Sequence, residues 1–371
     1  MKNLLTRIRS VLSLTHHYKK YCVHENKQTD SCKSSLRVYL DQLHIILKNG
    51  YPEPFYFIYG FQSKNIKTID KYLNYNSFQR QINFLNLNNP YFEYHARVIT
   101  ADKFYFYCFC KSIGIPVPEI ISYIMNKQCL YGVNCLNKTF ISQLFKEYNQ
   151  VFVKPCSGQM GEGSFILSRN EYNEYRINGK YKSEEQIVGL FQRGEWIVQA
   201  LISQHQALQR LYPESVNTIR LQTVMDEDGD VHPFGAILRI GRKGNIVDNW
   251  AKGGILVGID MEKGVLMKYG FIKPSFGSAV LTEHPDTKVM FYNYSIPYFR
   301  EAVLMAIRLH KNLYRCHSIG WDISITPDGP VFIEGNGLWE ISMVQIAHGG
   351  MKDTISKYFS YDKKKFMHRK V

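Results

Sequence analysis

Apolar and polar residues alternate with a period of two near the end of the chain. Residues 320–336, GWDISITPDGPVFIEGN, predict two strands joined by a Pro-Asp-Gly turn. Because successive strand side chains point to opposite faces, Glu334 and Asn336 share one face. With the turn centred on Asp328, Asp322 lies directly opposite Glu334. The other, apolar face is predicted to carry Ile323, Ile325, Val331 and Ile333.

The same patterning predicts the other elements of a mixed fold. Helical spacing marks residues 36–50, 101–112 and 296–314, the last with Val303, Leu304, Ile307 and Leu309 on one packed side. Gly50 is predicted to cap the first of these helices. Strands are predicted at 150–155, 165–168, 195–202, 218–241 (a pair around Asp228-Gly229) and near 262–266. The fold class is therefore α+β, with a largely antiparallel sheet.

Charge is distributed unevenly along the 371 residues. The net charge is +14, and residues 1–100 hold 14 basic against 6 acidic residues, an excess of 8. The N-terminus is basic and amphipathic, but it lacks the cleavage site of a secretory signal. An acidic substrate or an anionic membrane face would suit this charge. Nucleic acid is not expected, because no nucleic-acid-binding motif occurs.

Cysteine usage and hydropathy point to a cytoplasmic protein, with peripheral contact at the inner membrane face as an alternative. No apolar run of about 18 residues occurs, so no membrane-spanning helix is expected. The eight cysteines show no C-x-x-C pair and no zinc spacing. They are expected to be reduced and mostly buried.

The hairpin predicts a cation site. Carboxylates facing each other across a strand pair lie about 5 Å apart at Cβ and repel, so they need a cation or a shared proton. With Asn336, Asp322 and Glu334 offer the oxygen ligands that Mg²⁺ prefers, and Mn²⁺ is the alternative metal. The competing interpretation is a solvated hairpin face that carries unrelated polar residues.

A second segment predicts phosphate binding. Residues 151–167, VFVKPCSGQMGEGSFIL, place Lys154 at the end of a strand and before a loop with three glycines. Glycine lets backbone N–H groups approach an anion, and lysine adds a point charge. A plain hairpin turn is the competing interpretation. The loop glycines are Gly158, Gly161 and Gly163.

Taken in order, these blocks resemble the ATP-grasp superfamily over roughly residues 95–345. The subgroup they look like is the sugar-transfer-associated ATP-grasp family of bacterial polysaccharide gene clusters. The resemblance rests on ADKFYFY, FVKP with its glycine loop, WIVQALI, SVNTIRLQTV, LRIGRKGNIVDNWAKGG, HPDT and the hairpin. It implies two α/β subdomains that grip ATP, after a helical, basic N-terminal region.

The resemblance also implies roles for individual residues. Lys103 and Lys154 would bind the ATP phosphates, and residues 158–163 would close over them. The backbone at Gln199, Ala200 and Leu201 would pair with adenine, and Gln204 or His205 would contact the ribose in place of the usual acidic residue. Asp322, Glu334 and Asn336 would be the Mg²⁺ ligands. Arg220 and Arg239 are implied to stabilise the transferring phosphoryl group and the acylphosphate. Asn249, with Gly253 and Gly254, resembles the catalytic Asn…Gly-Gly block of carboxylate–amine ligases.

The implied activity is ATP-dependent carboxylate–amine ligation through an acylphosphate. The expected partners are an acidic sugar, such as a uronic acid, or an amino sugar, joined to an amine or amino acid. A sugar phosphotransferase and a non-catalytic nucleotide-binding module of a polysaccharide assembly complex remain as alternatives. The predicted divisions are 1–92 (helical basic region), 93–150 (linker and small ATP-grasp part), 151–345 (ATP-grasp core) and 346–371 (basic tail).

Overall fold

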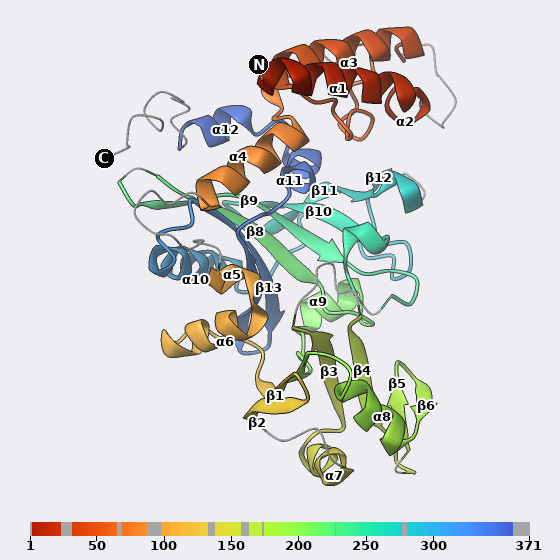
Figure 1. Ribbon diagram of the computed structural model, residues 1–371, viewed down its shortest axis with the longest axis vertical. Coiled ribbons are helices and arrows are strands. Elements are labelled where there is room, and N and C mark those ends of the chain that lie inside the picture. Colours follow the sequence, from red (N-terminus) through yellow and green to blue (C-terminus); the bar gives the residue numbers. More distant parts are fainter. Residues whose placement is uncertain are drawn as a thin grey trace.

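The computed structural model contains two antiparallel sheets and an N-terminal group of helices (Figure 1). It describes residues 2–23, 32–64, 69–87, 98–132, 138–156, 163–172, 174–226, 228–245, 247–276 and 280–358. This mixed architecture of two sheets with a helical N-terminal region confirms the predicted fold class. Within the described residues, no helix is long and apolar enough to cross a membrane.

The smaller sheet has the strand order β2-β1-β7-β3-β4-β5-β6. All its strand pairs are antiparallel, and α7 (Lys138–Glu147) and α8 (Glu184–Phe191) supply side chains to its core. The strands are β1 (Ile120–Met125), β2 (Gln128–Gly132), β3 (Gln150–Pro155), β4 (Phe165–Arg169), β5 (Tyr175–Ile177), β6 (Lys180–Lys182) and β7 (Trp196–Ala200).

The larger sheet has the order β12-β11-β10-β9-β8-β13-β14 and is also antiparallel. Short helices α9 (Gln206–Leu211), η2 (Trp250–Lys252) and η3 (Pro274–Phe276) lie in its connections. Its strands are β8 (Thr218–Met225), β9 (Val231–Ile240), β10 (Ile255–Asp260), β11 (Val265–Ile272), β12 (Val280–Leu281), β13 (Ser318–Thr326) and β14 (Gly329–Asn336).

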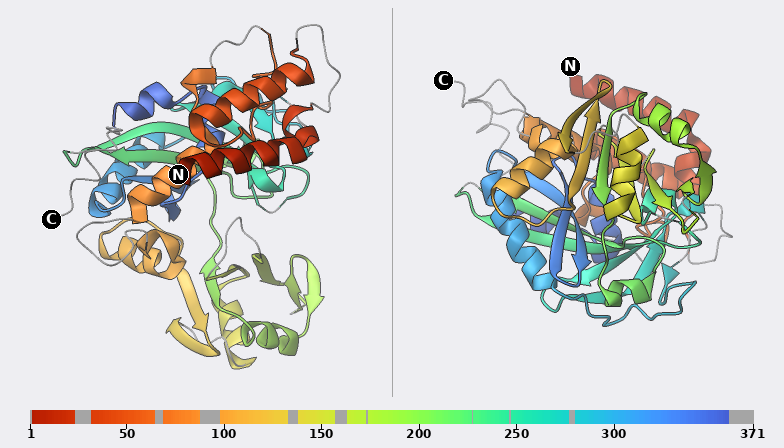
Figure 2. Two further views of the ribbon diagram at one scale, coloured as in Figure 1. Left: turned by 45° about the horizontal axis from the view of Figure 1, so that its top comes forward. Right: turned by 90° about the horizontal axis from the view of Figure 1, so that it is seen from below.

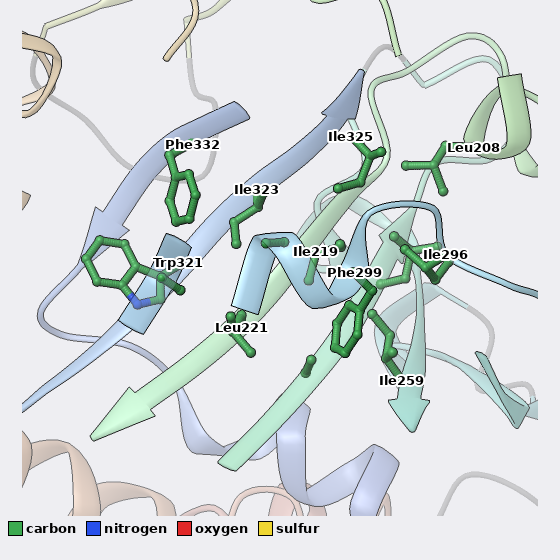
Figure 3. Close-up of a cluster of buried hydrophobic side chains, with 14 of the residues drawn as sticks. Leu208, Ile219, Leu221, Ile259, Ile296, Phe299, Trp321, Ile323, Ile325 and Phe332 are labelled. Carbon is green, nitrogen blue, oxygen red and sulfur yellow. The ribbon is translucent and has the colours of Figure 1, made fainter. Parts of the chain in front are cut away.

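One face of the larger sheet packs against α10 (Phe299–Asn312). Figure 3 shows Phe299 of this helix lying between Ile219 of β8 and Ile259 of β10. Trp321, Ile323 and Ile325 are fully buried on this face, as the alternation along β13 requires. The predicted packed side of the helix is wrong at Leu304, which is 58% exposed. The buried helix residues are Phe299, Ala302, Ala306, Leu309 and His310.

The opposite face of the larger sheet is covered by α11 (Ile341–His348) and, beyond it, by the N-terminal region. Ile237 and Leu256 of the sheet share a core with Met343 and Ile346 of α11 and with aromatic residues from 55–61. Gly50 caps its helix in the left-handed conformation, as predicted. The helices of this region are α1 (Lys2–His16), α2 (Tyr18–Cys22), α3 (Ser35–Asn49), η1 (Ile69–Lys71) and α4 (Tyr75–Leu87).

The remaining helices connect these parts. α5 (Val98–Ala101) and α6 (Lys103–Ser112) lead from the N-terminal region to the smaller sheet, and α12 (Lys352–Ser356) follows α11. Asp102 caps α6 by accepting hydrogen bonds from the backbone N–H groups of Phe104 and Tyr105. None of the cysteines in the described residues forms a disulfide. The four predicted divisions of the chain stay predictions.

Candidate active site

The 320–336 hairpin forms with the predicted pairing of its carboxylates, but through an irregular ladder. The two-residue turn pairs Thr326 with Gly329, and a continuous ladder from there would set Ile333 opposite Asp322. A bulge between Asp322 and Ile323 shifts the register, so that Asp322 faces Glu334. Because of the bulge, the predicted apolar face of the second strand is wrong. Phe332, instead of Val331 and Ile333, pairs with Ile323 and is fully buried.

Asp322, which is buried, and Glu334, which is half-buried, form a carboxyl pair. Burial raises the pKa of Asp322, two arginines lower it, and Glu334 raises it again, to about 6. Burial also acts to raise the pKa of Glu334, but a hydrogen bond with Asp322, together with Arg220, lowers it to about 2. The two groups titrate as one unit. Such a pair is a strong attractor for positive charge.

Two arginines from neighbouring strands provide positive charge at Asp322. On β8, the Nη2 of Arg220 donates to Asp322 Oδ2 at 2.9 Å, and its Nε lies 2.5 Å from Oδ1. On β9, the Nη2 of Arg239 lies 3.1 Å from the same Oδ2. Both arginines are nearly buried, at 7% and 9% exposure. Their planar guanidinium groups suit oxyanions with several charged oxygens.

Two further residues hold Arg239, and the sequence interpretation missed both in this role. Thr218 Oγ1 accepts from Nε and Nη2 of Arg239 at 3.0 and 2.6 Å. Asp248 Oδ2 in turn accepts from the backbone N–H and the hydroxyl of Thr218 at 2.9 and 2.5 Å, and lies 3.7 Å from Arg239 Nε. Thr218 was visible as a polar residue two positions before Arg220, on the same face of a strand.

The face that carries these groups has hydrogen-bonding capacity that the protein leaves unused. Gln222 follows Arg220 on β8, and Ser324 follows Asp322 on β13, both by two residues. Both side chains are fully buried, and no hydrogen-bond partner for them occurs among the described residues. Buried polar groups of this kind are costly without a partner, which is typical of ligand-binding faces.

Two lysines approach the hairpin from the side of the smaller sheet. Lys154 lies on β3 and is 8% exposed. Burial lowers its pKa to about 8, with Glu334 acting to raise the value and Lys103 to lower it. Lys103 begins α6, and its Nζ donates to the carbonyl of Cys156 at 3.4 Å. The structure therefore brings Lys154 near Glu334 of the larger sheet, and it brings Lys103 near Lys154.

The predicted glycine loop is only partly within the described residues. Gly158 and Gly161 lie outside them. Gly163 has a φ of +74°, and a Cβ there would lie 3.0 Å from Pro155 Cγ. This position suits glycine on both counts. Cys156 is buried and its pKa is raised to about 12 by burial, which agrees with an incidental role.

The predicted adenine hinge is the end of β7. Gln199 is 3% exposed and pairs with residues of both neighbouring strands, Ile120 and Phe152. The backbone N–H of Ala200 donates to Glu119 O at 3.0 Å. Leu201 is the first residue after the strand. An adenine contact at the hinge would therefore use the backbone of Leu201 more readily than that of Ala200.

Gln204 does not suit the predicted ribose contact, because its side chain is fully engaged. Its Nε2 donates to the carbonyls of Tyr212 and Ser215 at 3.0 and 2.9 Å. Its Oε1 accepts from the backbone N–H and the amide of Asn217, both at 3.1 Å. Gln204 thus holds a loop together, and the alternative residue, His205, caps α9 through Nδ1.

The segment around Asn249 forms a tight turn beside the arginines. Asn249 Oδ1 accepts from the backbone N–H of Ala251 at 2.8 Å and caps η2. Gly253 ends this turn with a φ of +92°. His284, the first residue of the HPDT motif, makes its hydrogen bonds within the protein. Its Nε2 lies 2.8 Å from the carbonyl of Gly241, and its Nδ1 accepts from the backbone of Asp286 and Thr287.

Comparisons with known proteins place the chain in a family. A family model described as sugar-transfer associated ATP-grasp matches residues 79–356. The chain belongs to this family. No curated protein matches. The match includes all the described polar residues of the site.

Solved structures of other ATP-grasp proteins are similar at low identity. D-alanyl-alanine synthetase A from Vibrio cholerae O1 biovar eltor matches with a TM-score of 0.38 and 12% identity, over 68% of this chain and 60% of that one. ATP-grasp ligase PsnB, complexed with minimal precursor, matches with a TM-score of 0.38 and 12% identity, over 71% of this chain and 62% of that one. N5-carboxyaminoimidazole ribonucleotide synthetase from Thermotoga maritima matches with a TM-score of 0.35 and 14% identity, over 65% of this chain and 43% of that one. The chain thus spans less than two-thirds of each of these proteins.

The donor set of this ATP-grasp chain fits Mg²⁺. No group of three or more His, Cys, Asp or Glu residues suited to a metal occurs in the described parts. Mg²⁺ does not need one, because it commonly binds one or two carboxylates and completes its shell with waters and phosphates. Asn336 Nδ2 donates to Glu334 Oε1 at 3.2 Å, which leaves the amide oxygen of Asn336 for a ligand bond.

Proposed function

We propose that this protein is an ATP- and Mg²⁺-dependent carboxylate–amine ligase that forms an amide through an acylphosphate. The proposal rests on one observation: a lysine of the smaller sheet lies near a carboxylate of the larger sheet. Lys154 and Lys103 come from the side of the smaller sheet, and Glu334 of the larger sheet interacts with Lys154. Membership of an ATP-grasp family supports a nucleotide at this place.

The chain's own residues would act mainly by positioning and by neutralising charge. Lys103 and Lys154 would bind the phosphates of ATP, as the family resemblance implies. Asp322, Glu334 and Asn336 would hold Mg²⁺, which supplies positive charge to the phosphate oxygens when it is bound. The backbone after β7 would receive adenine. The glycine loop would close over the phosphates and exclude water.

Arg220 and Arg239 would act on the group that is transferred. A substrate carboxylate oxygen attacks the γ-phosphorus, the bond to the β–γ bridging oxygen breaks, and ADP leaves. An amine then attacks the acyl carbon, inorganic phosphate leaves with its electron pair, and the amine nitrogen loses a proton. Both steps place negative charge on phosphate oxygens, and preorganised guanidinium groups stabilise that charge. Asp322 and Asp248 keep the two arginines in place beforehand.

The substrate class is part of the proposal. The carboxylate would belong to an acidic sugar, such as a uronic acid, or the acceptor would be an amino sugar, joined to an amine or amino acid in surface polysaccharide biosynthesis. The family description and the net charge of +14 support an anionic glycan precursor. Work on such a precursor would take place in the cytoplasm, where ATP is supplied.

Product analysis tests the proposal. The purified protein is incubated with ATP, Mg²⁺ and pairs of uronic acids and amines, the uronic acid carrying ¹⁸O in its carboxylate. A ligase gives ADP and phosphate in equal amounts, a product lighter by one water than the sum of its parts, and phosphate that contains one ¹⁸O. ADP without free phosphate, with a product heavier by one phosphoryl group, would instead establish a phosphotransferase.

A matched variant guards against contaminating ATPases. Lys154→Met keeps the length and apolar body of the side chain but removes the charge that would face the phosphates. It should lower ADP formation to background in every substrate pair. ADP formation that survives this substitution at the wild-type rate would show that the measured activity belongs to another protein or another site.

A further inference from the structure

The outer faces of α1 and α3 expose a set of large apolar side chains, named here the leucine stripe. On α1 the exposures are 61% for Leu4, 52% for Leu5, 48% for Ile8 and 65% for Leu12. On α3 they are 67% for Leu36, 48% for Leu40 and 64% for Leu47. Single exposed apolar residues are ordinary, but seven on two adjacent helices need an explanation.

The spacing of the leucine stripe shows that each helix has two apolar faces. Residues separated by three or four positions share a helix face, so Leu5, Ile8 and Leu12 lie together, as do Leu36, Leu40 and Leu47. The inward faces are already buried in the core shared with α11, through residues such as Leu14 and Ile46, both fully buried. The exposed residues are therefore not needed for the packing of the two helices.

The charge around the leucine stripe favours an anionic partner. No acidic residue occurs between residues 2 and 23, whereas Arg9, Lys19 and Lys20 are exposed there. On α3, Arg37 and Lys48 are exposed, but Arg37 lies 3.7 Å from Asp41 and Lys48 pairs with Asp70, so the unpaired basic charge lies on residues 2–23. Apolar side chains flanked by basic ones are the pattern of helices that lie in the interface of a membrane.

The position of these helices leaves room for such a surface. Figure 1 shows α1 and α3 side by side at one end of the molecule, with the smaller sheet at the other end. Both views in Figure 2 keep the two helices next to each other. A membrane surface at this end of the molecule would lie away from the smaller sheet.

We propose that α1 and α3 dock this protein on an anionic lipid bilayer, with the leucine stripe inserted among the headgroups and the basic side chains against the phosphates. Apolar burial and attraction to anionic lipid together set the strength of such binding. A second copy of the chain explains the apolar residues but not the basic ones, because like-charged faces repel. An anionic bilayer accounts for both the apolar and the basic side chains.

Vesicle flotation tests the proposal with the full-length protein. Wild type is mixed with vesicles of phosphatidylcholine alone or with about 30% phosphatidylglycerol, at low and high salt. We expect flotation with the anionic vesicles, weak flotation with neutral ones, and loss in high salt, because salt screens exposed charges. Equal flotation with both vesicle types, or none with either, would overturn the proposal.

Matched variants show whether the leucine stripe is responsible. Leu5→Gln/Leu12→Gln should lower the partition onto anionic vesicles about tenfold or more, and Arg9→Gln/Lys20→Gln should lower it and reduce its salt dependence. The control Leu130→Gln/Leu304→Gln removes two equally exposed leucines, 52% and 58%, from other elements. It should bind like wild type. Thermal unfolding of all variants checks that they fold.

The same variants test the alternative that a second copy of the chain covers the leucine stripe. The mass of wild type in solution, measured by light scattering, should match one chain and stay unchanged in Leu5→Gln/Leu12→Gln. A dimer that this variant dissociates, with unaltered vesicle binding, would make the leucine stripe a self-association surface and overturn the proposal. Ligase or ATPase activity in solution should be the same in all variants, so failure here would not affect the proposed function.

Discussion

Arg239 is placed by a chain of buried polar groups that starts at Asp248. Asp248 accepts two hydrogen bonds from Thr218, and the Thr218 hydroxyl oxygen accepts two from Arg239, whose Nη2 also reaches Asp322. Removing one partner of a buried charged pair leaves the other poorly compensated. Asp248 is thus a positioning residue. The sequence could not separate it from an ordinary turn residue, because the distance along the chain hides its contact with Thr218.

Asp248→Asn should lower kcat roughly ten- to a hundredfold, by analogy with the loss of residues that orient site groups. The amide oxygen can still accept one hydrogen bond, but the charge beside Arg239 is lost. KM for ATP should change little, since Arg239 is assigned to the transferring group. Steady-state kinetics measures both parameters, with Asp228→Asn, at an exposed position between β8 and β9, as the control. A KM increase without a change in kcat would contradict the assignment.

The hairpin shows how much of an element can be predicted from its pattern. The alternation of side chains predicted that Asp322 faces Glu334, and this pairing is confirmed. The bulge that produces it could not be predicted, because no residue in 320–336 marks its position. Short elements such as β5, β6 and α8 were also missed, since three to eight residues give too little periodicity. By contrast, the long helix at 299–312 was clear.

Close packing of α11 on the sheet depends on glycines in β9 and β13. A Cβ on Gly320 would lie 2.7 Å from Trp339 Cβ and 3.3 Å from a guanidinium nitrogen of Arg220. A Cβ on Gly235 would lie 2.7 Å from Val344 Cγ1. Both glycines thus let the segment after the hairpin approach the sheet beside the candidate site.

Gly320→Ala should lower the free energy of unfolding by about 1–3 kcal/mol, because the added methyl overpacks the contact with Trp339. The control is Gly189→Ala in α8, where the nearest atom to a Cβ is Arg193 Nη2 at 3.5 Å. It should be neutral or stabilise by up to about 1 kcal/mol, because alanine favours helix. Urea unfolding measures both. Equal stability of Gly320→Ala and wild type would show that Trp339 is not packed against Gly320 as described.

At the scale of the molecule, the N-terminal region is an integral part of the structure. Aromatic residues of the 55–61 segment share a core with β9, β10 and α11, and Gln345 of α11 bonds to Leu73 and Tyr59. This packing could not be predicted from the sequence, because these contacts join residues more than 270 positions apart. Removal of whole helices would therefore expose core, and point variants are the better probes.

Glu53 ties this region together and gives it a pH dependence. It is 3% exposed and accepts hydrogen bonds from Asn74 and from the backbone of Phe55 and Tyr75, yet burial raises its pKa from 4.5 to about 7. The native state therefore holds the proton more tightly than the unfolded state does. The stabilisation is complete below pH 4.5 and is lost as the pH rises through 7.

Between pH 5 and 8, wild type should lose about 2–3 kcal/mol of unfolding free energy relative to Glu53→Gln, which cannot ionise. Urea unfolding at several pH values measures the difference, and a substitution at the exposed Glu262, Glu262→Gln, serves as the control. A constant difference between wild type and Glu53→Gln over this range would mean that Glu53 has an ordinary pKa in the folded protein.

The central claim is that Asp322, Glu334 and Asn336 hold Mg²⁺ for a nucleotide bound between the sheets. The most direct test is ATP affinity by calorimetry, with and without Mg²⁺, in wild type and in Glu334→Gln, which removes one charge and conserves shape. We predict that Mg²⁺ strengthens ATP binding at least about tenfold in wild type and hardly at all in Glu334→Gln. The same Mg²⁺ enhancement in the folded variant as in wild type would contradict the claim.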